Sequence, residues 1–97
     1  MNTPQKPITI SAHAAERMRQ RGADRAEVEH AIRNGDWKPA QRGKWHVRQQ
    51  LAFGALSPIN KQYYRFKALD VVFADESRAI VVVTVKVFYH NGGGAVR

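Results

Sequence analysis

The pattern of apolar and polar positions divides the chain into a helical first third and a strand-forming remainder. A helix is expected over residues 12–21, because Ser11 is suited to cap its start and Gly22 is suited to end it. A second helix is expected to begin after Asp24, since Glu27 three residues later completes a capping box. Its apolar stripe, at helical spacing, consists of Val28, Ala31 and Ile32. The pattern therefore predicts two helices joined by a very short turn.

From residue 44 onward apolar positions alternate with polar ones, which is typical of strands with one covered face. Strands are expected over residues 44–53, 63–67, 69–74 and 79–89, and the middle two are either separate or one long bent strand. A loop over residues 54–60 and a turn over 75–78 separate them. The last strand is assigned two faces, one with Val81, Val83, Val85 and Val87 and the other with Ile80, Val82, Thr84, Lys86 and Phe88. This half of the chain predicts an antiparallel sheet.

Helices followed by strands predict an α+β fold, with two N-terminal helices packed on one face of a three- to four-stranded antiparallel sheet. The length of 97 residues fits one domain, expected over residues 8–90 with flexible segments at 1–7 and 91–97. No apolar run approaches the roughly 20 residues that span a bilayer, and residues 1–7 lack the apolar stretch of a signal peptide. We therefore expect the site of action to be the cytoplasm, without a membrane partner.

The chain is strongly basic, with 16 Lys and Arg residues against 8 Asp and Glu residues and a formal net charge of +8. No acidic residue lies between Asp36 and Asp70. Aromatic residues are interleaved with the cations of this stretch: Trp37, Trp45, Tyr63 and Tyr64. Cations bind phosphates and flat rings stack on unpaired bases, so nucleic acid is the expected partner, RNA before DNA. A solvated basic face and an acidic protein partner are the alternatives.

The residues expected to bind RNA come mainly from this stretch. They are Lys38, Arg42, Lys44, Trp45, Arg48, Lys61, Tyr64, Arg65, Lys67 and Lys86. Lys86 is included because it makes a small polar patch with Thr84 on an otherwise apolar strand. An edge or solvent-facing stretch of strand explains that patch equally well.

His13, Arg17 and Arg21 recur at i, i+4 and i+8 and therefore fall along one stripe of the first predicted helix. Histidine titrates near neutrality and can give or take a proton, while the arginine fork donates two parallel hydrogen bonds to phosphate. Because RNA carries its own nucleophile, the 2′-hydroxyl, this set predicts a metal-independent ribonuclease. In the structural alternative, His13 caps or packs near the helix start and the arginines pair with nearby acids.

His46 is the candidate for a second proton-transfer role, since it lies on the polar face of a predicted strand with Lys44 and Arg48. The chain has no cysteine, which excludes disulfides and thiolate metal sites. No two histidines have a metal-ligand spacing with a carboxylate, and the acids do not form the cluster of a two-metal nuclease. We therefore expect no metal and no cofactor.

The first predicted helix resembles the opening of a bacterial and phage family catalogued as domain of unknown function 4258. The shared pattern is His-Ala-x-x-Arg-Met-x-x-Arg-Gly, here at residues 13–22, and weaker matches follow at residues 69–73 and 84–85. The resemblance covers residues 8 to about 89. The family is similar to the barnase/RelE-like (BECR) superfamily, which implies a metal-independent endoribonuclease of toxin type. The resemblance also implies roles for the matching positions His13, Arg17, Arg21 and Thr84.

The sequence thus gives one leading hypothesis and two alternatives. In the leading hypothesis the 2′-hydroxyl of RNA attacks the adjacent phosphate, with His13 as general acid or base and with Arg17 and Arg21 stabilising the phosphorane charge. Thr84 or Tyr64 orients the phosphate. The alternatives are a non-catalytic nucleic-acid-binding module and a phage or bacterial protein that docks to an acidic partner, such as an antitoxin or immunity protein.

Overall fold

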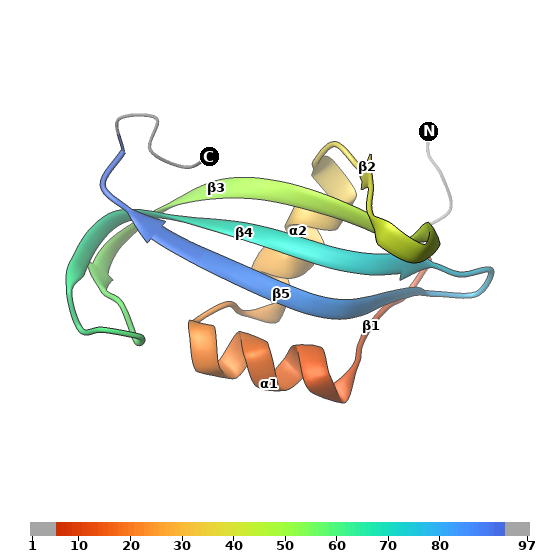
Figure 1. The fold of residues 1–97 in the computed structure, drawn as a ribbon, viewed down its shortest axis with the longest axis horizontal. Helices are drawn as coiled ribbons and strands as arrows, with labels where there is room; N and C mark the ends of the chain where they lie inside the picture. The colour runs from red at the N-terminus through yellow and green to blue at the C-terminus, as the bar shows by residue number, and fades with distance from the viewer. Residues whose placement is uncertain (1–5, 93–97) are drawn as a thin grey trace.

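The computed structural model describes residues 6–92, which form two α-helices and one five-stranded sheet (Figure 1). In chain order the elements are β1 (Ile8–Ile10), α1 (Ala12–Arg21), α2 (Arg25–Asn34), β2 (Lys38–Pro39), the 3-10 turn η1 (Gln41–Gly43), β3 (Trp45–Leu56), β4 (Tyr63–Asp75) and β5 (Ile80–His90). Neither helix in this range is long and apolar enough to cross a membrane. The predicted α+β class with two N-terminal helices is confirmed.

The sheet is mixed and has the strand order β1-β5-β4-β3-β2. β1 pairs with β5 in parallel, and every other pairing is antiparallel. The predicted sheet of three to four antiparallel strands is therefore matched only roughly. β1 and β2 contain three and two residues, which is too short for an alternating pattern to reveal. β4 is one strand of 13 residues rather than two separate strands.

The helix boundaries agree with the capping signals in the sequence. The side chain of Ser11 accepts a hydrogen bond from the backbone of the first turn of α1, and Gly22 ends that helix in the left-handed conformation with φ 85°. Asp24 and Glu27 form the expected reciprocal capping box at the start of α2. Both helices therefore lie where the sequence predicts them.

Both helices cover the same face of the sheet (Figure 1). α1 packs against β5, and α2 packs against β4 and β3. The largest fully buried side chains in this layer are Phe73, Ile32, Leu69, Val28, Val47, Val71, Val82 and Val85. Full burial of one such side chain contributes roughly 1.5–3 kcal/mol. Within residues 6–92 no helix covers the opposite face.

A bulge in β5 changes which residues face the core. Val72 pairs with Thr84 whereas Phe73 pairs with Val82, so Val83 is an extra residue in β5. An extra residue inverts the alternation of side chains on either side of it. The prediction that Val81, Val83, Val85 and Val87 share one face is therefore wrong before the bulge and correct beyond it. Beyond the bulge, Thr84, Lys86 and Phe88 share the uncovered face.

The two ends of the described range are bonded to the domain. Lys6 forms an ion pair with Asp75, and the carbonyl of Pro7 accepts a hydrogen bond of 2.9 Å from the backbone of β5. The side chain of Asn91 accepts a hydrogen bond of 2.9 Å from the backbone of Arg65. Lys6, Pro7 and Asn91, which belong to the segments predicted to be flexible, thus contact the sheet. Residues 1–5 and 93–97 of those segments lie outside the described residues.

Candidate nucleic-acid interface

The uncovered side of the sheet carries a group of polar side chains from β3, β4 and β5. The strand register aligns them in three rows: His46–Val72–Thr84, Arg48–Asp70–Lys86 and Gln50–Ala68–Phe88. Side chains directly opposite one another on neighbouring strands have Cβ atoms about 4.5–5.5 Å apart. These residues form one continuous surface, which we call the open face.

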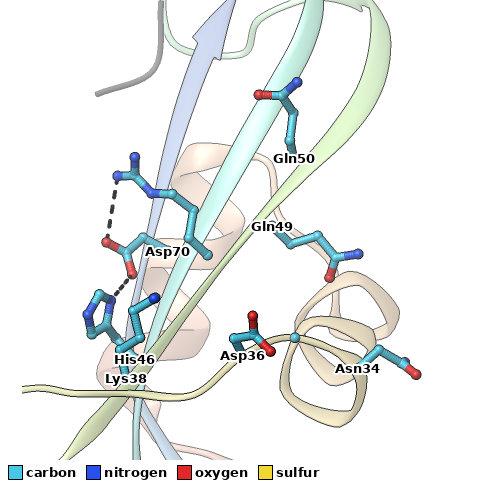
Figure 2. Close-up of a pocket in the computed structure, with 9 residues that line it drawn as sticks. Asn34, Asp36, Lys38, His46, Gln49, Gln50 and Asp70 are labelled. Carbon is cyan, nitrogen blue, oxygen red and sulfur yellow. Dashed lines mark hydrogen bonds and ion pairs between the residues drawn. The ribbon is translucent and has the colours of Figure 1, made fainter. Parts of the chain in front are cut away.

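His46 and Asp70 are joined at the centre of the open face. The Nδ1 atom of His46 lies 3.1 Å from Oδ1 of Asp70, and a guanidinium nitrogen of Arg48 lies 3.8 Å from Oδ2 (Figure 2). The side chain of Asp70 is 16% exposed, whereas that of His46 is 34% exposed. The carboxylate is therefore a partly buried anchor for two surface groups that carry or can acquire positive charge.

The contact with Asp70 orients the ring of His46. When Nδ1 carries the proton it donates to the carboxylate, and Nε2 is then free to take up another proton. An oriented imidazole with one free nitrogen is the arrangement that general base catalysis requires. The sequence predicts His46 as a site residue but misses Asp70, because only the register between β3 and β4 brings the two together.

Two clefts flank His46 and Asp70, and both residues line each of them. The first cleft, of about 700 Å³, extends toward the C-terminal end of α2, where it is lined by Asn34 (Figure 2). The second cleft, of about 620 Å³, extends toward η1, where it is lined by Arg42 and Lys44. Ligand sites for small molecules commonly have volumes of about 300–1,000 Å³, so either cleft can accept a group of nucleotide size.

Positive charge exceeds negative charge around Asp70. Lys38 of β2 pairs with His46 and lines the first cleft, while Lys86 of β5 pairs with Asp70 and lines the second. With Arg48, three permanent cations and one histidine lie around Asp70, and Asp36 adds a second carboxylate to the first cleft. The net charge of this group remains positive after both carboxylates are counted, and such a group attracts phosphate.

An aromatic residue that is absent from the sequence-based site completes the open face. Phe88 is 40% exposed, and the guanidinium carbon of Arg48 lies 5.0 Å from the centre of its ring. A cation at this distance from the face of an aromatic ring is attracted to it. The signal for Phe88 was present in the sequence, because it alternates along β5 with the polar residues Thr84 and Lys86.

Trp45 does not belong to the open face. Its ring packs against the core, 6.0 Å from the ring of Trp37. The indole nitrogen of Trp37 in turn donates a hydrogen bond of 2.8 Å to the carbonyl of Ile32. Trp45 is therefore partly buried against the core, on the covered side of the sheet, rather than on the open face as a base-stacking residue.

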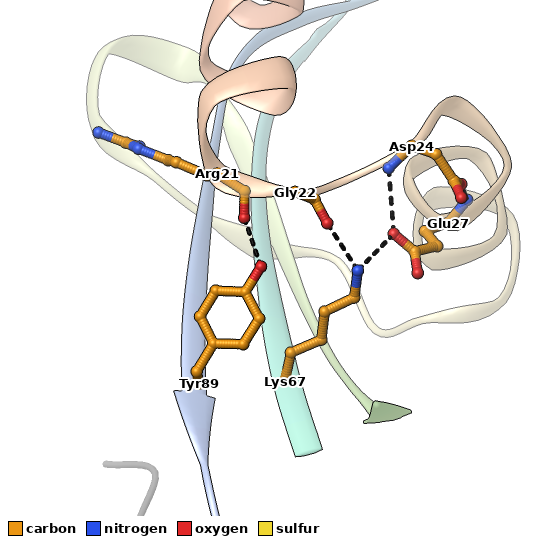
Figure 3. Close-up of polar contacts among 6 residues, drawn as sticks. All are labelled: Arg21, Gly22, Asp24, Glu27, Lys67 and Tyr89. Carbon is orange, nitrogen blue, oxygen red and sulfur yellow. Dashed lines mark hydrogen bonds and ion pairs between the residues drawn. The ribbon is translucent and has the colours of Figure 1, made fainter. Parts of the chain in front are cut away.

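Lys67 is also removed from the interface, because it lies beneath the helices. Its side chain is 7% exposed, and its ammonium group donates hydrogen bonds to the carbonyl of Gly22 at 2.7 Å and to Oε1 of Glu27 at 3.0 Å (Figure 3). The same Oε1 atom accepts a hydrogen bond from the backbone of Asp24. Lys67 thus ties the turn between the helices to β4, and it is not available to the phosphates that the sequence predicts it to bind.

Tyr89 fastens the same turn from β5. Its hydroxyl donates a hydrogen bond to the carbonyl of Arg21 (Figure 3). Burial raises the pKa of Tyr89 above its ordinary value of 10.0, and the negative charge of Glu27 raises it further. The fold therefore favours the neutral phenol, which is the form that can donate this hydrogen bond.

Lys61, Tyr64 and Arg65 lie at the hairpin between β3 and β4. Tyr64 precedes Val72, the partner of His46, by eight positions along β4, which corresponds to roughly 27 Å of strand. Neither cleft beside His46 is lined by any of the three. Lys61 and Arg65 can extend the positive surface along the sheet, but none of the three shares a site with His46.

His13, Arg17 and Arg21 form the predicted stripe along α1, the helix that packs against β5. Arg21 donates a hydrogen bond of 2.9 Å to the carbonyl of Val85, Arg17 is half-buried and His13 is exposed. α1 packs against β5, so β4 and β5 separate it from β3, which carries His46. The structure therefore does not bring the two histidines to one phosphate, and they mark two separate candidate centres.

Residues 10–87 match a protein family described as Domain of unknown function (DUF4258). The chain belongs to this family. The sequence-based resemblance to it is confirmed, whereas the further similarity to the barnase/RelE-like ribonucleases stays a prediction. No curated protein and no solved structure matches the chain.

The segment that matches DUF4258 contains both candidate centres of this domain and ends one residue before Phe88. Across residues 6–92 no group of three or more His, Asp or Glu side chains is arranged to hold a metal ion. The ionisable groups that this DUF4258 domain brings together on its open face are His46, Asp70 and the cations around them.

Proposed function

We propose that the protein binds RNA across the open face and cleaves it without a metal ion, with His46 as the proton-transfer group. The observation that carries the proposal is the 3.1 Å contact between Nδ1 of His46 and Oδ1 of Asp70. The carboxylate supplies orientation, while Arg48 and Lys86 beside it supply charge. The proposal transfers the leading role from His13 to His46, because only His46 has both an orienting partner and neighbouring cations.

The proposed reaction begins when Nε2 of His46 takes the proton of a ribose 2′-hydroxyl. The 2′-oxygen forms a bond to the adjacent phosphorus, and the bond from phosphorus to the 5′-oxygen breaks, which leaves a 2′,3′-cyclic phosphate. The departing 5′-oxygen takes a proton from solvent. Lys38, Arg48 and Lys86 stabilise the additional negative charge on the phosphorane, and Thr84 orients one of its oxygens.

The direct test is incubation of the purified protein with a labelled single-stranded RNA in excess EDTA. Cleavage is expected to persist, to leave 2′,3′-cyclic phosphate ends and to spare DNA of the same sequence, which lacks the attacking hydroxyl. A DNA strand with one ribonucleotide is expected to be cut only at that ribonucleotide. Activity that is lost in chelator and restored by magnesium would show that the proposed reaction is wrong.

A non-catalytic RNA-binding module is the second candidate. The observation that favours it is that the other histidine on this side of the sheet, His90, pairs with Phe66 three rows away from His46, so a second proton-transfer side chain of that type is not beside it. In this case the protein binds RNA with the same dependence on Arg48 and Lys86, and the strand remains intact after long incubation. The cleavage assay therefore separates the two candidates directly.

A toxin role is supported only by the resemblance to the barnase/RelE-like superfamily, whereas an acidic protein partner is supported by that resemblance and by the positive charge of the chain. We include the toxin role in the proposal as a cellular consequence of RNA cleavage. Expression in bacteria of the native chain, but not of His46→Ala, is expected to stop growth and to degrade RNA. Equal growth with both chains would contradict the toxin role, but it would not contradict RNA binding on the open face.

A further inference from the structure

Phe88 is the one large apolar side chain of the open face that remains substantially exposed. Within residues 6–92 the exposed large hydrophobic residues are Leu56, Ile59, Tyr63 and Phe88. The first three belong to the hairpin between β3 and β4, whereas Phe88 lies on β5, beside the candidate site. Phe88, 40% exposed, is therefore the exposed large apolar side chain that lies next to the candidate site.

The neighbours of Phe88 leave its ring accessible. In the same row of the open face lie Ala68 and Gln50, and the alanine side chain is too short to cover a ring. The ring of Phe66 lies in the next row and is covered. His90 stacks on it with ring centres 5.5 Å apart, and Gly92 lies against it. Phe88 is thus the aromatic surface that the open face presents.

The position of Phe88 fits a nucleotide whose phosphate lies at the proposed catalytic centre. Lys86 precedes Phe88 by two residues on the same face, a separation of roughly 6.7 Å along a strand. Arg48 connects the two positions, since its guanidinium lies 3.8 Å from Asp70 and 5.0 Å from the ring centre of Phe88. A phosphate held by Lys86 and Arg48 therefore places an attached base within reach of the ring.

We propose that Phe88, together with the guanidinium of Arg48, is a stacking platform for an unpaired base, so that the open face selects single-stranded RNA. This inference rests on the proposed function, because it assumes that RNA phosphates occupy the adjacent cationic site. Every base has a flat face, so the platform tolerates different sequences. Bases inside a duplex already stack on their neighbours and cannot reach a ring in the sheet.

The experiment compares binding of three labelled probes that 2′-hydroxyl attack cannot cleave. They are a 2′-O-methyl oligouridine strand, a strand of equal length and charge in which abasic sites replace the central bases, and a 2′-O-methyl duplex. Each is titrated against the native protein, Phe88→Leu, Phe88→Tyr and the control Tyr63→Leu. Tyr63 suits the control because it is an aromatic residue 58% exposed on the hairpin, away from the site. Thermal melting of each variant verifies that it is folded.

Phe88→Leu is expected to weaken binding of the base-bearing strand about tenfold or more. The slope of log affinity against log salt should be the same for Phe88→Leu and the native protein, because the ring neutralises no phosphate. Phe88→Tyr and Tyr63→Leu should bind as the native protein does. The abasic strand should bind the native protein about tenfold more weakly than the base-bearing strand, and Phe88→Leu should weaken it no further.

Two outcomes would overturn the stacking platform while leaving the proposed function intact. One is steep, salt-dependent binding of the base-bearing strand that is equal for the native protein and Phe88→Leu. The other is native protein that binds the duplex as tightly as the single strand. If the native protein binds none of the probes at low salt, both the stacking platform and the proposed function are wrong.

Discussion

Nδ1 of His46 lies 3.1 Å from Oδ1 of Asp70, although the two residues are 24 positions apart in the sequence. They lie on neighbouring antiparallel strands, where Arg48 is the residue directly paired with Asp70. One partly buried carboxylate thus holds both a histidine and an arginine at the surface of the sheet. This relationship gives the open face an oriented imidazole as well as a cationic surface.

Asp70→Asn is expected to lower the rate of RNA cleavage while changing RNA affinity much less. The amide no longer favours the tautomer with the proton on Nδ1, so Nε2 of His46 is less often free to accept a proton. The loss should be smaller than that of His46→Ala, for which about a hundredfold to ten-thousandfold is expected. Single-turnover cleavage at saturating protein measures the rate, and fluorescence anisotropy measures binding. An unchanged rate in Asp70→Asn would remove the orienting role.

Lys67→Met and Lys86→Met are expected to have opposite consequences, although each removes one positive charge. Lys67→Met leaves the carbonyl of Gly22 and the carboxylate of Glu27 without their buried donor. It should therefore lower the free energy of unfolding by about 1–3 kcal/mol. Lys86→Met should change it by less than roughly 0.5 kcal/mol. Urea denaturation at neutral pH measures both values.

The same two variants should differ in the reverse sense in RNA binding. Lys86→Met is expected to reduce the slope of log affinity against log salt by about 1, because one phosphate contact is lost. Lys67→Met, assayed where it is fully folded, should keep the native slope. A reduced slope in Lys67→Met and a native slope in Lys86→Met would contradict binding of RNA on the open face.

Tyr89→Phe is expected to flatten the loss of stability at alkaline pH. Burial, together with Glu27, raises the pKa of Tyr89 above 10.0 in the fold, so the unfolded chain releases the phenolic proton first. The stabilisation by this group is complete below pH about 10 and is lost as the pH rises through the raised pKa. Denaturation curves of the native chain and Tyr89→Phe from pH 8 to 11 should therefore converge as the pH rises. A constant difference between them would contradict the assignment.

Both helices could be predicted because the residues that begin and end them act through local contacts. Ser11 and Gly22 bound α1, and the pair Asp24 and Glu27 begins α2, through contacts that span only a few positions. Such signals act before any tertiary contact forms. The stripe of His13, Arg17 and Arg21 could also be predicted from its helical spacing, and in the structure these residues lie along one side of α1.

The centre on the open face could not be predicted in the same way, because it depends on strand register. A shift of β3 by one residue against β4 would move His46 to the covered side of the sheet. The extra residue Val83 in β5 likewise inverts the alternation without leaving a mark in the hydrophobic pattern. Asp70 was visible in the sequence only as the end of an acid-free stretch.

Burial also separated residues that composition treats alike. The acid-free stretch contains several cations and aromatics, yet Lys67 and Trp45 lie on the covered side of the sheet whereas Arg48 lies on the open face. A count of charges cannot make this distinction, because it follows from the side of the sheet that each residue occupies. The same rule brought Phe88, outside the basic stretch, into the candidate site.

The most direct test of the central claim compares RNA cleavage by His46→Ala and His13→Ala with cleavage by the native chain, per folded molecule. His13 is exposed, so His13→Ala should change the free energy of unfolding by less than roughly 0.5 kcal/mol. His46→Ala removes a hydrogen bond to Asp70 and should lower it by about 1 kcal/mol, which is why cleavage is compared per folded molecule. We predict that His46→Ala loses cleavage about a hundredfold or more while it still binds RNA, and that His13→Ala cleaves at nearly the native rate. Native cleavage by His46→Ala with loss of cleavage in His13→Ala would contradict the account and place the reaction along α1.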